Sequence, residues 1–101
     1  MAKKALLTWN IRADSEREHF KRVREFVAKL PSLGLVLEDA WYTVYGTAPQ
    51  VLLGIVEQGR HKGTLQKVLA SDQWEQLLSD LKPYITGYMQ RIVEGEGRFH
   101  I

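Results

Sequence analysis

Apolar and polar positions alternate in some stretches of the chain and recur with helical spacing in others. Four segments have the aliphatic, β-branched and aromatic composition of strands: residues 4–11, 35–45, 50–57 and 86–94. After the first of them, one face of a helix is predicted to carry Phe20, Val23, Phe26, Val27 and Leu30. Ser15 and Glu18 have capping-box spacing at the start of that helix.

A second helix is predicted in two parts. It begins at Thr64, bends at Ser71 and Asp72, where a short polar side chain offers a new N-cap, and ends near Pro83. Residues 46–49 form a turn, so the second and third strands are predicted to pair as an antiparallel hairpin. We therefore predict one domain over residues 1–101, with its core in residues 4–94 and a short C-terminal tail at 95–101.

The element order β-α-β-β-α-β is the split βαβ arrangement of the ferredoxin-like fold. This is an α+β fold in which a four-stranded antiparallel sheet carries two helices on one face. The strands, however, are apolar on both faces, because Leu6 and Thr8 alternate with Leu7 and Trp9 in the first of them. In the second strand, strict alternation separates two sets: Leu35, Leu37, Trp41 and Tyr45 from Val36, Ala40, Tyr42 and Val44.

Two helices cover only one face of such a sheet, and the other face would expose more apolar surface than a monomer tolerates. We expect a second copy to cover it about a twofold axis, which makes the protein a homodimer through the sheet face.

Composition narrows the class of protein. The 101 residues are 45% hydrophobic and 26% charged, as in globular domains, and the net charge is +2. The sequence has no cysteine, which excludes disulfides, thiolate metal sites and a catalytic thiol. It has no apolar run of roughly 18 residues, so no membrane partner is expected, and no secretory cleavage site follows the N-terminus. These features favour a cytoplasmic protein.

With this strand order, the two-sided strands and the interrupted helix at residues 69–74, the chain resembles the dimeric α+β barrel superfamily. That superfamily includes antibiotic-biosynthesis-type monooxygenases, heme-degrading enzymes and stress-responsive barrel proteins. The resemblance implies a ligand pocket between the helices and the sheet. The heme-degrading branch has a tryptophan and a histidine where this chain has Val68 and Leu78, so heme and other cofactors are not expected.

The sheet order implied by the resemblance gathers several side chains at one end of each subunit. The candidate catalytic residues are Asn10, which resembles a pocket asparagine of the monooxygenase-like and heme-degrading branches, and His19 on the apolar arc of the first helix. The candidate ligand-binding residues are Trp41, Tyr42, Tyr45, Tyr84 and Tyr88. Each has a structural alternative: the aromatic residues as core or interface, His19 as a hydrogen-bonded helix residue, and Asn10 as a cap of the turn at Asp14.

Other site classes are disfavoured. His19, His61 and His100 lack the spacing of a metal site, so no metal is expected. The third strand has no exposed aromatic residue for stacking on bases, which argues against a nucleic-acid partner at the sheet; the basic stripe of Arg17, Lys21 and Arg24 is a weaker alternative. Two hypotheses remain: a dimer that binds a small organic ligand, with cofactor-independent oxygenation as its most specific form, or a non-catalytic structural, regulatory or ligand-sensing dimer.

Overall fold

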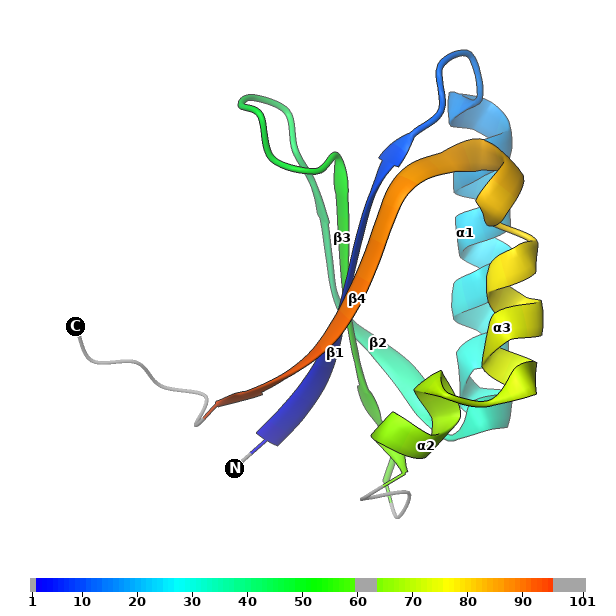
Figure 1. Ribbon diagram of the computed structural model, residues 1–101, viewed down its shortest axis with the longest axis vertical. Helices are drawn as coiled ribbons and strands as arrows, with labels where there is room; N and C mark the ends of the chain where they lie inside the picture. The colour runs from blue at the N-terminus through cyan, green and yellow to red at the C-terminus, as the bar shows by residue number, and fades with distance from the viewer. Residues whose placement is uncertain (1, 60–63, 96–101) are drawn as a thin grey trace.

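The computed structural model describes residues 2–59 and 64–95 as a sheet covered on one side by a layer of helices (Figure 1). Its elements, in chain order, are β1 (Ala2–Ile11), α1 (Glu16–Lys29), η1 (Leu30–Leu33), β2 (Leu35–Tyr42), β3 (Val51–Glu57), α2 (Leu65–Leu69), α3 (Asp72–Ser79), η2 (Lys82–Tyr84) and β4 (Ile85–Gly95). The predicted order of strands and helices is confirmed.

The sheet is antiparallel, with the strand order β2-β3-β1-β4. The first and last strands of the chain are therefore neighbours, and β2 and β4 form the two edges. All helices lie on the same side of the sheet (Figure 1). This is the ferredoxin-like α+β arrangement that the sequence predicts. No helix in the described ranges is long and apolar enough to cross a membrane.

The core lies between the sheet and the helices. On β1 the side chains facing the helices are Ala5, Leu7, Trp9 and Ile11, all of them buried. They pack with Phe26 and Leu30 from the first helical segment and with Trp74, Leu78 and Leu81 from the second. Every second side chain of the strands therefore packs against the apolar face of the covering helices, and together they form a single core layer. We call this side the inner face of the sheet.

The opposite, outer face is also apolar. Residues that pair directly across neighbouring strands point to the same face, so the register places Trp41 with Leu52, and Met89 with Thr8, on the outer side. Trp41 is 69% exposed and Met89 is 70% exposed. The predicted two-sided character of the strands is therefore present in the fold.

The prediction of strict alternation along β2 is wrong. The register shifts between Leu37 and Asp39, so one residue of β2 has no direct partner on β3 and the remaining side chains change faces. Leu35 and Leu37 face inward, but Trp41, which the alternation puts on the same side as these two, faces outward, and Tyr42 faces inward. The strand also ends at Tyr42 and not at residue 45. A β-bulge leaves no mark in a pattern of apolar positions, which explains the error.

Of the two N-caps predicted from the sequence, one is present in the structure and the other is not. Ser71 caps α3 as predicted, because its hydroxyl oxygen accepts a hydrogen bond from the Trp74 N–H at 3.2 Å. The predicted capping box at α1 is wrong, since the Ser15 side chain makes no cap hydrogen bond. There Asp14 adopts a left-handed conformation (φ 63°), and Ser15 (ψ 9°) lacks the extended backbone that a capping side chain needs.

Candidate functional site

A buried pair of hydrogen-bonded rings joins α1 to the sheet. Trp9 on β1 donates its indole N–H to Nε2 of His19 on α1 at 2.8 Å, and both side chains are 0% exposed. The two rings meet edge to face, with centroids 6.0 Å apart. The sequence places these residues together because Trp9 lies on the inner face of β1 and His19 lies on the apolar arc of the helix that covers it.

The hydrogen bond fixes the state of His19. An imidazole nitrogen that accepts a hydrogen bond carries no proton, so the neutral ring holds its proton on Nδ1. Burial lowers the pKa of His19, because the charged form loses its hydration, and this favours the neutral ring. Within the described residues Nδ1 has no hydrogen-bond partner. A buried donor without a partner costs roughly 1–3 kcal/mol, so an acceptor that reached it would be bound favourably.

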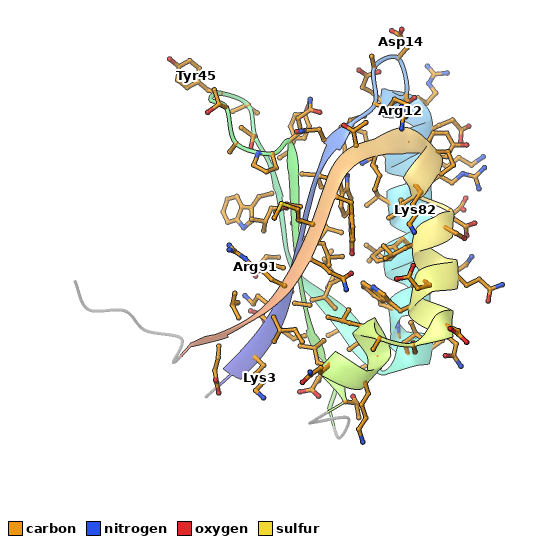
Figure 2. The ribbon with its side chains drawn as sticks, in the orientation of Figure 1. Lys3, Arg12, Asp14, Tyr45, Lys82 and Arg91 are labelled. Carbon is orange, nitrogen blue, oxygen red and sulfur yellow. The ribbon has the colours of Figure 1, made fainter. Side chains whose placement is uncertain are left out.

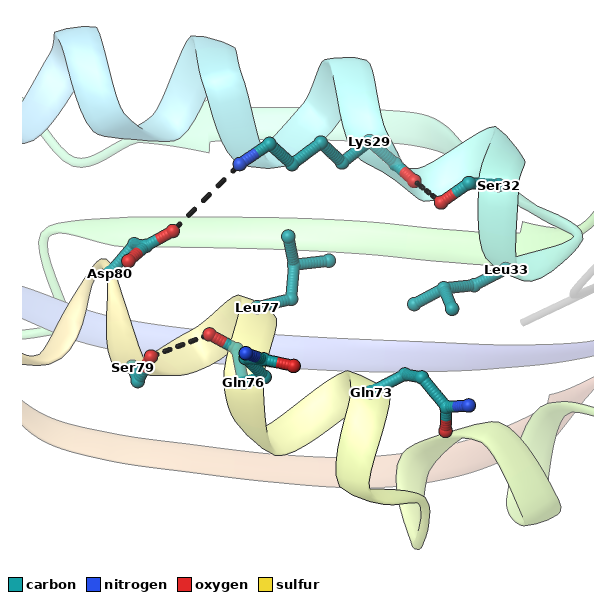
Figure 3. A pocket seen from close by; sticks show the side chains of 8 residues that line it. All are labelled: Lys29, Ser32, Leu33, Gln73, Gln76, Leu77, Ser79 and Asp80. Atoms are coloured by element: carbon teal, nitrogen blue, oxygen red, sulfur yellow. Dashed lines mark hydrogen bonds and ion pairs between the residues drawn. The ribbon is translucent and has the colours of Figure 1, made fainter.

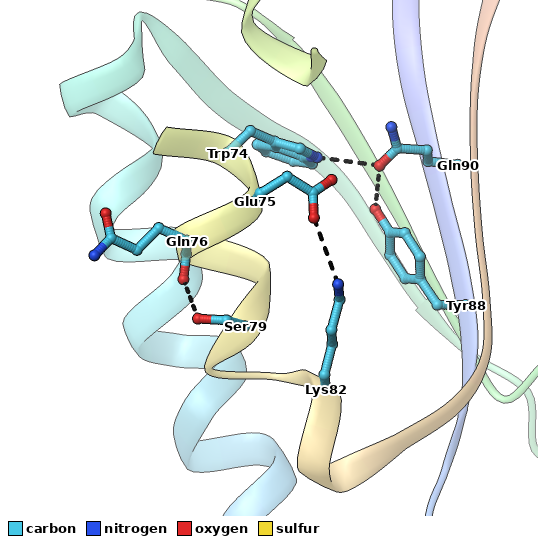
Figure 4. A network of polar contacts seen from close by, with 7 residues as sticks. All are labelled: Trp74, Glu75, Gln76, Ser79, Lys82, Tyr88 and Gln90. Carbon is cyan, nitrogen blue, oxygen red and sulfur yellow. Dashed lines mark hydrogen bonds and ion pairs between the residues drawn. The ribbon is translucent and has the colours of Figure 1, made fainter. Parts of the chain in front are cut away.

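A second group of polar contacts lies further along the same layer (Figure 4). Tyr88 on β4 donates its phenol proton to Oε1 of Gln90 at 2.6 Å, and the indole N–H of Trp74 on α3 donates to the same oxygen at 3.1 Å. Burial raises the pKa of the Tyr88 phenol, and the negative charge of Glu75 adds to the effect. Tyr88 is therefore a protonated hydrogen-bond donor at neutral pH.

The two groups are connected by the stacking of Trp9 on Tyr88, with ring centroids 6.1 Å apart and planes 25° apart. We call the connected set the inner row: His19, Trp9, Tyr88, Gln90 and Trp74. It runs from fully buried His19 to half-buried Tyr88 and exposed Gln90 on the edge strand β4. Aromatic walls with a few convergent polar groups are the usual lining of a small-molecule site.

Some of the predicted site residues lie near the inner row. His19 and Tyr88 belong to it. Tyr42 faces the same side, and its ring lies 6.0 Å from that of Phe20, which in turn lies 4.6 Å from the ring of His19. Tyr84 lies on η2, half-buried, with the Arg22 guanidinium 5.9 Å from its ring centre.

The other predicted residues lie elsewhere. Asn10 pairs with Thr86 across the strands and, with Thr8, belongs to the outer face of β1, so the sheet separates it from His19. Its Oδ1 accepts a hydrogen bond from the backbone N–H of Gln50 at 3.0 Å. Trp41 is also on the outer face. Tyr45 lies at the tip of the β2–β3 hairpin and is 96% exposed.

Sequence reasoning missed three members of the inner row. Trp9 belongs to the apolar pattern of the first strand and Trp74 to that of the second helix, and neither pattern indicates the acceptor that a buried indole N–H needs. Gln90 was not singled out. Its signal is an amide in the predicted fourth strand, two residues after Tyr88 and hence on the same face.

A groove of about 430 Å³ lies on the other side of the helix layer, between α1 and α3 (Figure 3). An ion pair with 3.9 Å between Lys29 Nζ and Asp80 Oδ2 spans it. The rest of its lining is mostly exposed neutral side chains: Ser32, Leu33, Gln73, Gln76, Leu77 and Ser79. Leu77 belongs to the buried core, and the polar side chains of the groove are exposed to solvent, so the inner row is the stronger candidate. Among the described residues no group of three or more His, Cys, Asp or Glu could hold a metal ion; His61 and His100 lie outside the described residues.

No protein-family model matches the sequence, and no curated protein matches it either. Solved structures do match the fold. A NIPSNAP family protein from Agrobacterium tumefaciens is 24% identical, with a TM-score of 0.67 over 96% of this chain and 95% of that one. An uncharacterised NIPSNAP domain protein from Burkholderia xenovorans is 15% identical, with a TM-score of 0.66 over 98% and 99%.

A solved antibiotic biosynthesis monooxygenase is also similar, at 15% identity and a TM-score of 0.60 over 93% of this chain and 98% of that one. Likeness of this kind over nearly the whole of both chains shows a common fold. The chain therefore has the ferredoxin-like α+β fold that NIPSNAP and antibiotic biosynthesis monooxygenase-like proteins share, as its resemblance to the α+β barrel superfamily implies.

Proposed function

We propose that the protein acts as a homodimer in which the outer faces of two sheets pack against each other. The observation that supports this most directly is the exposure of Trp41 and Met89, which lie on the outer face of the two edge strands, β2 and β4. Covering roughly 600 Å² of apolar surface contributes on the order of 15 kcal/mol before the entropic costs of association. That gain is large enough for a stable dimer.

Light scattering tests the dimer. We expect a mass of twice 11.6 kDa for the protein, and a mass of 11.6 kDa for a Trp41→Arg variant, which puts a charge into the apolar face. The matched control is Ala28→Arg, which places the same charge at an exposed position on α1. Circular dichroism reports whether each variant is folded. A wild-type mass of 11.6 kDa at micromolar concentration would contradict the proposal.

We further propose that each subunit binds a small, partly aromatic organic molecule at the inner row. The Nδ1–H of His19 would supply a donor. The phenol oxygen of Tyr88, whose own proton goes to Gln90, would supply an acceptor, and the rings of Trp9 and Tyr88 an aromatic surface. The proposed catalytic pair of Asn10 and His19 is divided by the sheet, so this proposal retains His19 at the inner row. Cofactor-independent oxygenation, in which the substrate supplies the electrons, is the most specific form of the proposal, and the similar fold of a monooxygenase supports it.

One observation favours a second candidate, a non-catalytic structural, regulatory or ligand-sensing dimer. Trp9, His19 and Trp74 are each 0% exposed, so the inner part of the row is packed as tightly as the rest of the core. Such packing stabilises a subunit without requiring a substrate. In this case the polar contacts of the row satisfy buried groups and the dimer itself is the functional unit.

Tryptophan fluorescence distinguishes the candidates. A Trp41→Phe variant leaves Trp9 and Trp74, both in the inner row, as the only indoles. A set of small aromatic compounds, including phenols and hydroquinones, is titrated against it. Binding of a compound is expected to change the emission. Tyr88→Phe is expected to weaken that binding about tenfold through one lost hydrogen bond. Tyr45→Phe removes a phenol at the hairpin tip and serves as the control.

Oxygen uptake by the compounds that bind then separates catalysis from sensing. Uptake that depends on the protein and falls in His19→Gln supports the oxygenase. Saturable binding without uptake supports a ligand sensor. If no compound alters the emission of Trp9 and Trp74 at millimolar concentration, the ligand site at the inner row is refuted and the structural dimer remains.

A further inference from the structure

The hairpin between β2 and β3 extends beyond the sheet as an arm. We define the arm as residues 43–49, which connect the end of β2 to Gln50, the residue before β3. It projects from the end of the sheet and bends away from the helix layer (Figure 1), with Tyr45 at its tip (Figure 2). Val44 is 89% exposed and Tyr45 is 96% exposed, so two large side chains have almost all of their surface open within the described part of the chain.

The arm is held at its base by side-chain hydrogen bonds. Oδ1 of Asn10 accepts from the Gln50 N–H at 3.0 Å, while Oε1 of Gln50 accepts from the Ile11 N–H at 2.6 Å. This reciprocal pair joins the end of β1 to the start of β3 just beyond their last backbone pairing, between Trp9 and Val51. The arm therefore starts from a fixed point.

Two further bonds stiffen the arm itself. The Thr43 N–H donates to the Gln50 carbonyl at 2.8 Å, and the Thr43 hydroxyl donates to the Pro49 carbonyl at 2.7 Å. A segment ordered in advance loses less entropy when it binds than a flexible one does. Val44 and Tyr45 are thus presented on a preorganised support.

The arm continues the outer face of the sheet. Trp41, on the same strand, points to the outer side, which is the side toward which the arm bends. The charges on that face cancel: Lys4 Nζ lies 2.5 Å from Asp39 and 2.8 Å from Glu38, and Arg91, which pairs with Leu6, carries the second positive charge. A surface without excess charge can approach an identical surface, whereas a charged ligand or a nucleic acid would need an opposite charge.

We propose that the arm docks on a second copy of this chain, where Val44 and Tyr45 are buried against the partner subunit, and that Asn10 and Gln50 are positioning residues for the arm. The proposal rests on the homodimer proposed above. Because a twofold axis relates the subunits, each dimer has two such arms, and the partner that covers the outer face lies within their reach.

The experiment compares dimer dissociation constants by sedimentation equilibrium. Replacing both Val44 and Tyr45 with serine is expected to raise the dissociation constant about a hundredfold, because two apolar side chains per subunit lose their contact. The far-UV circular dichroism spectrum is expected to stay unchanged, since neither side chain is buried in its own subunit. Ala48→Ser, on the same arm, is the control and should match the wild type.

The positioning role has its own test. Asn10→Ala removes the acceptor of the Gln50 N–H and is expected to raise the dissociation constant about tenfold, although Asn10 itself need not touch the partner. Asn10→Asp keeps an acceptor oxygen at that position and should restore wild-type association. If Asn10 only stabilises the subunit, Asn10→Ala would lower the urea midpoint of the isolated monomer and leave the dissociation constant of the dimer unchanged.

The outcomes separate the two proposals. If the wild type is monomeric at all concentrations, the homodimer fails and the docking arm fails with it. If the wild type is a dimer that Trp41→Arg dissociates, while the double serine variant associates normally, the homodimer stands and the docking arm is refuted. Weakened association of the double serine variant, with normal association of Ala48→Ser, supports the arm.

Discussion

The buried imidazole of His19 is expected to make the protein sensitive to mild acid. Its Nε2 accepts the Trp9 indole N–H at 2.8 Å and its side chain is 0% exposed. A proton added to Nε2 would remove this hydrogen bond and place a charge in the core. The folded protein therefore resists protonation of His19, and burial lowers its pKa below the ordinary value of 6.5.

The sign of the effect follows from proton binding. Below pH 6.5 the unfolded chain takes up a proton on His19, whereas the folded chain does not until its lowered pKa is reached. The unfolded state then binds more protons, so the free energy of unfolding falls as the pH falls. Over that window the loss approaches about 1.4 kcal/mol for each pH unit. Above pH 7 His19 is neutral in both states and contributes no pH dependence.

Urea denaturation followed by circular dichroism, at one fixed protein concentration between pH 5 and pH 8, measures this slope. In His19→Gln the amide oxygen can still accept from Trp9 but the side chain does not titrate, so the profile should become flatter below pH 6.5. Parallel profiles for the wild type and His19→Gln would refute the assignment of a buried neutral His19.

Two further predictions concern stability. Gly54→Ala is expected to destabilise the fold, because its Cβ would lie 2.7 Å from Asp39 Oδ2 and 3.0 Å from Lys4 Cδ. In an Asp39→Ala background the loss of stability should be smaller. Urea midpoints that shift additively for the two changes would contradict this. Ser71→Ala should lower the free energy of unfolding by about 1 kcal/mol, through loss of the acceptor for the Trp74 N–H, while Ser79→Ala at an exposed helix end should cost less.

The fold is largely predictable from the sequence because its signals are local and repeated. β1 and β3 are rich in aliphatic, β-branched and aromatic residues over seven or more positions, and the helix face ending at Leu30 has one consistent period. Gly34, whose φ is 76°, ends the η1 turn where a glycine after a proline predicts a stop. Each of these features depends on residues within one or two turns of one another, so pattern reasoning reaches them.

The errors arise where one extra residue in a strand shifts the alternation of its side chains. A single bulge between Leu37 and Asp39 exchanges the faces of Trp41 and Tyr42, because side chains alternate with a period of two. The composition of the strand is the same with or without the bulge. The bulge decides which of the two lies at the inner row: Tyr42 faces the helices, whereas Trp41 faces outward and lies apart from the other candidate ligand-binding residues on the inner side.

Asn10 shows why a candidate site is harder to predict than a strand. An asparagine at the exposed end of an apolar strand has the same local sequence whether its amide meets a ligand or holds a loop. What distinguishes the two is its partner, and Gln50 lies 40 residues further along the chain. The pairing of β1 with β3 brings the two side chains together only after the register is set. Its hydrogen bond joins Asn10 to the hairpin, which is why dimer association, with Asn10→Asp as the rescue, is the measurement that tests its proposed role.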